Sequence, residues 1–453
     1  MRCFPILLAA AAMTLAFEVQ ADERALDTEV MAAAPPVQRA CPGELPSGAL
    51  CFAGQDGVGS TYWVALPEAW NHDVLVVHTH GGPADTGPAR PSRALEDLKR
   101  WAVTVKAGYA WAGTTYRRGG YGVTMAAEDA ERLRRIFVRF FGTTRRTLLH
   151  GNSYGAGVAA KTAELFATVD GRRGPYDGVL LTSGVLGGGV RDYEFRLDLR
   201  VVYQFFCRNH PRPDEPAYPL WMGLPKESTL TRAELARRVD ECTGVRHPVA
   251  ERTMAQRSRL AAILDVIRIP EKTLVAHLAW ATFLFRDLTQ IRLGGRNPWG
   301  NVGATYQGSE QDDVLNAGVL RYPADPAAVA QLAADSAPTG RVNVPILTLH
   351  AVDDPTAFVE FESAYRAVLE RAGTADLLVQ TFSDDAEHSY LGDTKYVAEF
   401  QALLAWIDQG NKPTPLAVAQ RCLGLEPRYG ATCRMLPGYF PAPLESRVAP
   451  RPR

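Results

Sequence analysis

Residues 146–157 read RTLLHGNSYGAG and place the pattern Gly-x-Ser-x-Gly, residues 151–155, directly after a short apolar run. An Ala-rich stretch with helical character, residues 156–168, follows it. On its own the pattern arises by chance in many chains. Between a strand and a helix it predicts a sharp turn that lifts Ser153 above a sheet edge, because a side chain at either glycine would collide with the neighbouring strand or helix. Ser153 is therefore the candidate nucleophile.

The segments around this turn alternate between strand-like and helix-like patterns. Runs of aliphatic and β-branched residues predict strands at 73–79, 109–116, 146–150, 178–183, 344–350 and 376–382. Amphipathic spacing predicts helices at 92–106, 126–141, 359–372 and 395–409, and residues 50–67 are typical of a hairpin. Such alternation indicates βαβ units around a mostly parallel sheet, an α/β fold.

The alternation stops after residue 186 and resumes at 342. Residues 187–341 are mostly helical and too many for a loop, so they predict a helical cap or lid that splits the α/β core into 46–186 and 342–410. Residues 22–45 are rich in Ala and Pro and predict a loose leader. The prolines after residue 411 predict an extended, Pro-rich C-terminal tail over 411–453.

The N-terminus has the layout of a secretory signal peptide over residues 1–21. Arg2 precedes the apolar run 3–17, and Val19-Gln20-Ala21 supplies a small-x-small cleavage pattern. Cleavage near Ala21 predicts an exported protein, periplasmic or secreted, and removes Cys3. An even set of cysteines then remains, and their spacing favours three local disulfides among several possible pairings, namely Cys41–Cys51, Cys207–Cys242 and Cys422–Cys433.

The sequence His80-Gly81-Gly82-Pro83 follows the predicted strand at 73–79. Glycines at this place let the backbone approach a substrate carbonyl, although a plain structural turn is the alternative. We expect one oxyanion-hole amide at Gly82, with Gly81 as the alternative. The second is expected at Tyr154, the residue after the nucleophile.

A serine hydroxyl needs a base and a group that orients the base. His388 is the candidate base, because it follows the last predicted core strand in a polar loop. Asp353 and Asp354 both follow the strand at 344–350, so the residues alone leave two candidate acids. A solvated turn or a helix N-cap is the structural alternative for either carboxylate.

In this order, HGGP, GNSYG, HAVDDP and EHS resemble the α/β-hydrolase superfamily over about 47–186 and 342–410. The resemblance implies a doubly wound, mostly parallel sheet of about eight strands with a cap after the sixth. It also implies a catalytic triad of Ser153, Asp354 and His388, and it favours Asp354 over Asp353. HGGP is similar to the oxyanion loop of esterases and of prolyl-iminopeptidase-type peptidases.

The predicted cap contains two features that bear on a substrate. The first is a set of aromatic residues, Trp221, Trp280, Phe283, Phe285, Trp299 and Tyr306. In one interpretation they line an acyl or aryl pocket, and in the favoured interpretation they form the cap's own core. Residues 191–200 alternate in charge. Such a run binds a substrate carboxylate in one interpretation, but is more often a solvated or salt-bridged helix face.

The composition excludes other classes of function. With 49 Lys and Arg against 50 Asp and Glu, the net charge of −1 provides no basic face for nucleic acid. No later apolar window is long enough for a stable membrane span, and no motif calls for a metal or a cofactor. We therefore expect an exported serine esterase, carboxylesterase-like, acting on small or oligomeric esters. The alternatives are a prolyl-aminopeptidase-like serine peptidase and a noncatalytic binding protein of the same fold. The oligomeric state stays open.

Overall fold

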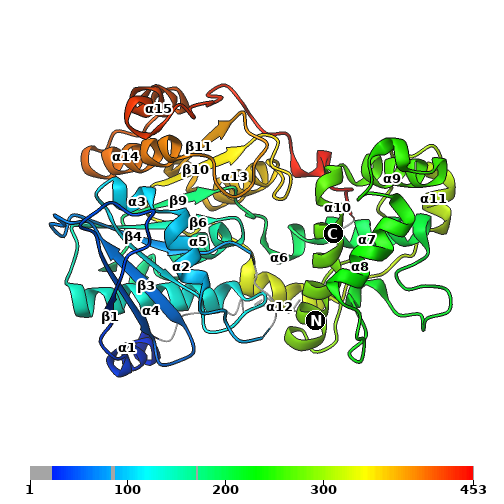
Figure 1. Cartoon of the computed structure of the whole chain (residues 1–453), viewed down its shortest axis with the longest axis horizontal. Coiled ribbons are helices and arrows are strands. Elements are labelled where there is room, and N and C mark those ends of the chain that lie inside the picture. Colours follow the sequence, from blue (N-terminus) through cyan, green and yellow to red (C-terminus); the bar gives the residue numbers. More distant parts are fainter. Residues whose placement is uncertain (1–22, 83–86, 170–171, 452–453) are drawn as a thin grey trace, which may run out of the picture.

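The computed structural model describes residues 23–82, 87–169 and 172–451. Two bodies are visible in Figure 1: a sheet with helices on both faces, and a purely helical body beside it. The chain enters the helical body after β9 and returns from it into β10. The sheet body is the part that carries the turn around Ser153.

The main sheet has nine strands in the order β1-β2-β3-β5-β4-β6-β9-β10-β11. The pairs β1–β2, β2–β3 and β3–β5 are antiparallel. All pairs from β5 to β11 in this order are parallel. The strands are β1 (Val37–Arg39), β2 (Leu50–Gln55), β3 (Thr61–Leu66), β4 (Val74–Thr79), β5 (Ala110–Thr114), β6 (Arg146–Asn152), β9 (Gly178–Thr182), β10 (Ile346–Ala351) and β11 (Leu378–Ser383).

This architecture confirms the α/β-hydrolase fold that the sequence predicts. Without the short edge strand β1, eight strands remain, and the helical insertion leaves the sheet after β9, the sixth of them. The β2–β3 hairpin falls where residues 50–67 predict it. A separate two-stranded ribbon, β7 (Thr168–Val169) and β8 (Arg172–Arg173), was not predicted.

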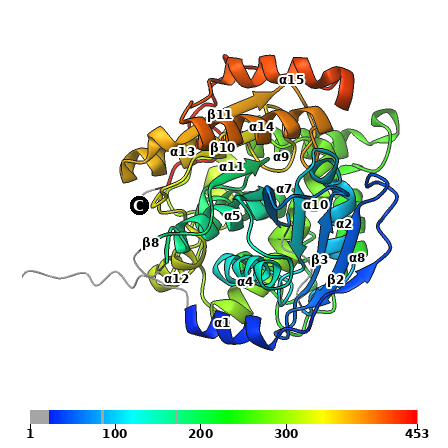
Figure 2. The same cartoon turned by 90° about the vertical axis from the view of Figure 1, so that its left-hand side faces the viewer.

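Helices cover both faces of the sheet (Figure 2), because the parallel strands are apolar along their whole length and must be shielded on both sides. One face packs against α1 (Glu23–Ala32), α4 (Val123–Phe141), α5 (Tyr154–Leu165) and α13 (Phe361–Ala372). The other packs against α2 (Arg93–Arg100), α3 (Val103–Lys106), α14 (Asp393–Gln409) and α15 (Pro415–Tyr429).

Between β9 and β10 the structure is helical. The α-helices of this insertion are α6 (Gly188–Arg191), α7 (Glu194–Cys207), α8 (Arg232–Thr243), α9 (Met254–Ile267), α10 (Leu274–Ala279), α11 (Asp312–Gly318) and α12 (Pro326–Ser336). Three of the six predicted cap aromatics are buried in its core: the rings of Phe285 and Trp299 stack at 3.9 Å, and Tyr306 is also buried. The other three, Trp221, Trp280 and Phe283, are partly buried and pack against this core. The insertion is thus a packed body rather than a long loop, and its apolar core continues into sheet-body residues such as Tyr154 and Phe361.

Two terminal segments differ from expectation. The expected loose leader contains α1, whose Leu26 and Val30 are buried one helical turn apart against the sheet body. The expected extended tail contains α15, which begins at Pro415 with Thr414 as its N-cap. Proline at the first position of a helix costs no hydrogen bond, so a proline such as Pro415 is compatible with the start of a helix and does not by itself indicate extended chain.

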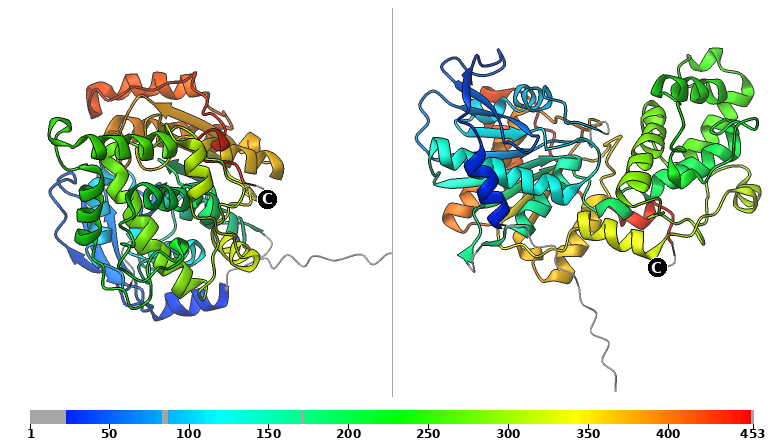
Figure 3. Two further views of the ribbon diagram at one scale, coloured as in Figure 1. Left: turned by 90° about the vertical axis from the view of Figure 1, so that its right-hand side faces the viewer. Right: turned by 90° about the horizontal axis from the view of Figure 1, so that it is seen from below.

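The last described residues return to the insertion (Figure 3). Leu444 and Val448 join its apolar core, and the Arg451 guanidinium pairs with the Asp198 carboxylate at 2.6 Å. Upstream, the ring of Tyr439 packs on Phe382 of β11 at 5.0 Å. We call residues 439–451 the C-terminal strap, because they contact both bodies.

Three disulfides are formed, and they join the pairs that the spacing favours: Cys41–Cys51, Cys207–Cys242 and Cys422–Cys433. Such bonds are typical of proteins outside the reducing cytosol. No helix among residues 23–82, 87–169 and 172–451 is long and apolar enough to cross a membrane. The expected signal peptide and Cys3 lie outside the described residues.

Candidate active site

Ser153 stands at the turn between β6 and α5 with φ 58° and ψ −124°, a backbone conformation that L-residues rarely adopt. The glycines on both sides are required by close backbone contacts. A Cβ atom at Gly155 would lie 2.1 Å from the Thr79 carbonyl oxygen, and one at Gly151 would lie 2.2 Å from the Gly155 carbonyl oxygen. The turn is therefore the strained elbow that the sequence predicts.

His388 connects the serine to a carboxylate. Its Nε2 lies 2.8 Å from Ser153 Oγ, and its Nδ1 lies 2.9 and 2.8 Å from the two carboxylate oxygens of Asp354. With Asp354 ionised, Nδ1–H donates to the carboxylate and leaves Nε2 free to accept the serine proton. The structure thus brings together the three side chains that the sequence predicts, from the ends of β6, β10 and β11.

Asp354 is held in place by its own turn. Oδ1 accepts the N–H groups of Thr356 at 2.8 Å and Ala357 at 2.9 Å, and the side chain is buried. Asp353 is exposed, and the carboxylate in contact with His388 is that of Asp354, so the geometry favours Asp354 where the residues alone left two candidates. Nor is Asp354 the N-cap of α13, which is Glu360.

Behind Asp354 lies a buried pair that the sequence did not reveal. His350 Nε2 lies 3.5 Å from the second carboxylate oxygen of Asp354, and His350 Nδ1 lies 3.1 Å from Glu362 Oε1. Glu362 is fixed in turn by Thr348 at 2.8 Å and Gln380 at 2.6 Å. Both members of the pair are fully buried.

This pair sets the charge of the site. Burial opposes the His350 cation, but hydrogen bonds to Asp354 and Glu362 outweigh it and raise the pKa of His350 to about 10. Burial also opposes the Asp354 anion, yet His388 and His350 outweigh it and lower the pKa of Asp354 to about 2. Asp354 is therefore a stable carboxylate at neutral pH, as an orienting group must be.

The loop after β4 packs directly on the nucleophile. A Cβ atom at Gly81 would lie 3.1 Å from Ser153 Cβ. Arg93 donates to the Gly81 carbonyl oxygen at 2.9 Å. In a trans peptide the C=O and the following N–H point in opposite directions, so this contact turns the Gly82 N–H away from Arg93. Gly82 has φ 66°, and no atom lies within 4 Å of a Cβ built there.

Tyr154 is the first residue of α5, so its amide has no partner within the helix. Its ring is fixed among aromatic neighbours: it packs on Tyr121 at 5.2 Å, and its hydroxyl accepts the Gly122 N–H at 3.0 Å. The helix dipole adds positive potential at this end. The Tyr154 amide thus lies at the positive end of α5, directly after Ser153.

Chemically, this arrangement can deprotonate a serine and hold the resulting imidazolium against a carboxylate. Ser153 is shielded, with 8% of its surface exposed. No group of three or more metal-binding side chains gathers anywhere in the described part of the chain.

Solved structures of esterases and lipases match most of the chain at low identity. An esterase from Aspergillus oryzae is 12% identical over 84% of this chain and 86% of its own, with a TM-score of 0.38. Candida antarctica lipase A in its closed state is 11% identical over 84% and 83%, with a TM-score of 0.45. Feruloyl esterase B from Aspergillus oryzae is 13% identical over 84% and 87%, with a TM-score of 0.41. No protein-family model and no curated protein matches the chain.

His350, Glu362 and Arg93 are the residues around the site that sequence reasoning missed. His350 ends an apolar strand, and Glu362 lies in an amphipathic helix, where a carboxylate is ordinarily solvated. The one available signal was the i,i+4 spacing of His350 and Asp354 beyond a strand end. Spacing alone does not say which way either side chain points.

Proposed function

We propose that this protein is an exported serine hydrolase that cleaves carboxylic esters through an acyl-enzyme. Ser153 Oγ attacks the ester carbonyl while His388 Nε2 takes its proton. Asp354 orients the imidazole and stabilises the imidazolium. The amides of Gly82 and Tyr154 bind the oxyanion, with Gly81 as the alternative to Gly82. His388 then protonates the leaving alcohol, and a water activated by the same nitrogen releases the acid.

One observation carries the proposal: His388 lies within hydrogen-bond distance of Ser153 Oγ on one side and of Asp354 on the other, with no substrate needed to form the contacts. A serine on a plain structural turn has no reason to occupy a strained backbone conformation under a histidine. A noncatalytic protein of this fold has no need for all three groups.

The test compares esters with amides on the purified mature protein. One panel contains p-nitrophenyl esters from acetate to long acyl chains, and the other contains aminoacyl and prolyl p-nitroanilides. We expect ester turnover that falls by at least about 10⁴-fold in Ser153→Ala. Ser389→Ala, at the residue directly after the proton acceptor His388 but outside the triad, is the matched control and should keep most of the activity.

Two other results would contradict the proposal. Turnover of anilides in preference to esters would identify a peptidase of prolyl-aminopeptidase type. A wild-type protein that turns over neither panel and whose Ser153 resists a fluorophosphonate probe would be a binding protein. Labelling that depends on Ser153 and His388, together with ester turnover, supports the esterase.

The proposal includes the organisation of the chain. We place a signal peptide at 1–21, a leader at 22–45, the hydrolase core at 46–186 and 342–410, the cap at 187–341 and a C-terminal segment at 411–453. The three disulfides support maturation in an oxidising compartment. Intact-mass measurement of the protein recovered outside the cytoplasm should give a chain that begins at Asp22.

A further inference from the structure

Arg196, near the start of α7, is a buried cation without a carboxylate partner. Its side chain donates Nη1–H to the Asp192 carbonyl oxygen at 3.2 Å, and its Nε–H has no acceptor. The residue is 4% exposed. Among the residues that the structure describes, no carboxylate forms an ion pair with it. Burying such a charge is costly unless something compensates it.

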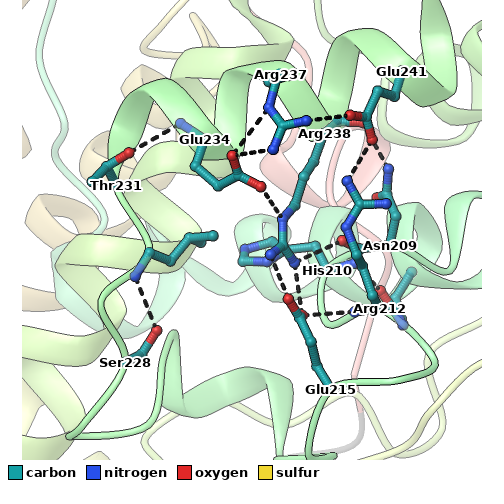
Figure 4. A network of polar contacts seen from close by, with 12 residues as sticks. Asn209, His210, Arg212, Glu215, Ser228, Thr231, Glu234, Arg237, Arg238 and Glu241 are labelled. Atoms are coloured by element: carbon teal, nitrogen blue, oxygen red, sulfur yellow. Dashed lines mark hydrogen bonds and ion pairs between the residues drawn. The ribbon is translucent and has the colours of Figure 1, made fainter.

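Two other buried arginines of the insertion have more acceptors than Arg196, although among the described residues Arg200 likewise has no carboxylate partner and an Nε–H without an acceptor. Arg238 pairs with Glu215 at 2.7 Å and Glu234 at 3.1 Å, in the network drawn in Figure 4. Arg200, equally buried, donates to three oxygen atoms, the carbonyls of His210 and Gly223 and the hydroxyl of Tyr218. Arg196 alone of these three keeps most of its five N–H donors unused.

Aromatic rings surround the guanidinium instead. Its central carbon lies 4.5 Å from the ring centre of Tyr193, 4.6 Å from that of Phe195 and 4.7 Å from that of Trp280. Rings stabilise the cation through their faces, but they accept no hydrogen bond in the guanidinium plane. The rings therefore leave most of the N–H donors of the planar fork without an acceptor, and a carboxylate matches such a fork with two parallel hydrogen bonds.

Contacts connect this cation to the triad from two directions. Trp280 packs on His277 at 5.4 Å, and His277 Nε2 donates to the carbonyl oxygen of Pro355, the neighbour of Asp354. On the other side Tyr193 packs on Tyr121 at 5.5 Å, and Tyr121 packs on Tyr154, the neighbour of Ser153. Arg196 therefore lies on the side of the insertion that faces the site.

The charge balance around Arg196 favours an anion. Burial lowers the pKa of Arg196 to about 10, so the group remains a cation at neutral pH. The nearest acidic side chain, Asp192, gives its carboxylate to the Gly187 N–H at 2.8 Å, and burial raises its pKa to about 7. The tyrosines that face Arg196, Tyr193 and Tyr121, have pKa values raised by burial and are neutral. A full counter-ion is thus missing.

We infer that Arg196 binds a carboxylate of the substrate, and that the preferred substrates are esters which carry a free carboxylate near the scissile bond. This inference rests on the proposed ester hydrolysis and narrows it to a substrate class. Half-esters of dicarboxylic acids carry the carboxylate on the acyl side. Esters of hydroxy acids carry it on the alcohol side. In either class Arg196 acts as a specificity residue and takes no part in the bond-making steps.

The experiment uses matched pairs of esters that differ in charge. On the acyl side, mono-p-nitrophenyl glutarate is compared with its methyl ester, and on the alcohol side 4-acetoxybenzoate is compared with methyl 4-acetoxybenzoate. We expect the wild type to favour the charged member of one pair by at least tenfold in kcat/KM. The pair that shows this preference identifies the side on which the carboxylate lies.

Arg196→Gln should abolish that preference while changing kcat/KM for the neutral esters less than about threefold. Arg196→Lys, which keeps the charge without the fork, should retain part of it. Arg237→Gln is the control, because Arg237 is an exposed arginine of the same insertion, with 62% of its side chain exposed. A merely structural role for Arg196 would lower turnover of both members of each pair equally.

Equal turnover of charged and neutral esters by the wild type, or a preference that survives Arg196→Gln, would overturn the inference and leave the esterase intact. If Arg196→Gln does not fold, inhibition of wild-type turnover of neutral esters by glutarate, but not by its dimethyl ester, supports the inference, and the absence of inhibition contradicts it. Calorimetric binding of mono-methyl glutarate to Ser153→Ala tests the carboxylate site even where no ester is hydrolysed, so the two proposals fail separately.

Discussion

Buried cations of the sheet body and Arg196 of the helical insertion differ in their partners. In the sheet body, Arg132 is fully buried and pairs with Asp129 at 2.6 Å and Asp56 at 2.9 Å. His350 is fully buried between Glu362 and Asp354. In the insertion, Arg196 is buried among aromatic rings with no carboxylate in contact.

The presence or absence of a carboxylate partner distinguishes buried charges that position other groups from buried charges that can bind a ligand. A cation whose donors are all occupied fixes its partners in place, as His350 fixes Asp354. A cation whose donors are unused gains its stabilisation only when a ligand supplies the acceptors. On this view the sheet body contributes the reaction, and the insertion contributes the choice of substrate. The two bodies can therefore be tested separately.

The largest effect on turnover is expected in the sheet body, where the buried charges are paired, for the variant Asp354→Asn. An amide cannot hold His388 in the required tautomer, so kcat should fall by about 10⁴-fold, as it does when the orienting aspartate of a serine hydrolase is replaced. Asp353→Asn is the matched control, because Asp353 is the exposed neighbour. Steady-state hydrolysis of a p-nitrophenyl ester measures both. Similar losses in the two variants would remove Asp354 from the triad.

The second prediction compares the effects of replacing the buried Arg132 and the buried Arg196 on the free energy of unfolding. Among the described residues, Arg132→Met leaves the buried Asp56 carboxylate without a paired cation and Asp129 with Arg117 alone, so it should lower the free energy of unfolding by about 3–5 kcal/mol. Arg196→Met removes an unpaired charge from an apolar site and should lower it by less than about 1 kcal/mol, or raise it. Urea unfolding of both variants measures the contrast. A loss at Arg196 as large as that at Arg132 would show that the aromatic contacts of Arg196 are structural.

A smaller effect is expected at His350. We expect His350→Gln to lower kcat/KM on the order of tenfold, about 1.4 kcal/mol, because Asp354 loses a neighbouring cation. The pKa of His350 is raised on folding from 6.5 to about 10, so its contribution to stability is complete below pH 6.5 and is lost as the pH rises toward 10.

The difference in unfolding free energy between wild type and His350→Gln should therefore shrink from pH 6.5 to pH 10. Denaturant titrations at a series of pH values measure it. A difference that stays constant over this range would mean that His350 is neutral in the folded protein and acts through packing alone.

The sheet body was predictable from the sequence because each of its local patterns is compatible with only one kind of local structure. Gly151 and Gly155 flank Ser153 where a Cβ atom would collide with backbone, and the parallel strands are apolar enough to be recognised individually. The carboxyl ends of these strands meet at one sheet edge, so the order of Ser153, Asp354 and His388 along the chain implied their meeting in space.

The insertion and the termini were less predictable, because their contacts depend on partners that are distant in sequence. The charged residues at 191–200 have different surroundings: Asp198 forms an ion pair with the distant Arg451, whereas Arg196 has no ion-pair partner among the described residues. The neighbouring sequence does not show which of these charged residues is paired. Likewise α1 and α15 are helices because the sheet body buries one side of each, which composition alone does not reveal.

The C-terminal strap has a mechanical consequence. It is fixed to β11 through Tyr439 and to the insertion through Leu444, Val448 and Arg451, so it forms a third connection between the bodies besides the two chain crossings at β9 and β10. Any swing of the insertion away from the sheet must stretch this segment or pull Arg451 from Asp198. A protease that cuts between residues 440 and 443 would remove this third connection without touching any residue of the site, and besides the two chain crossings it would leave only the direct contacts between the bodies, such as those of Asp335 with Thr124, to hold the insertion in place.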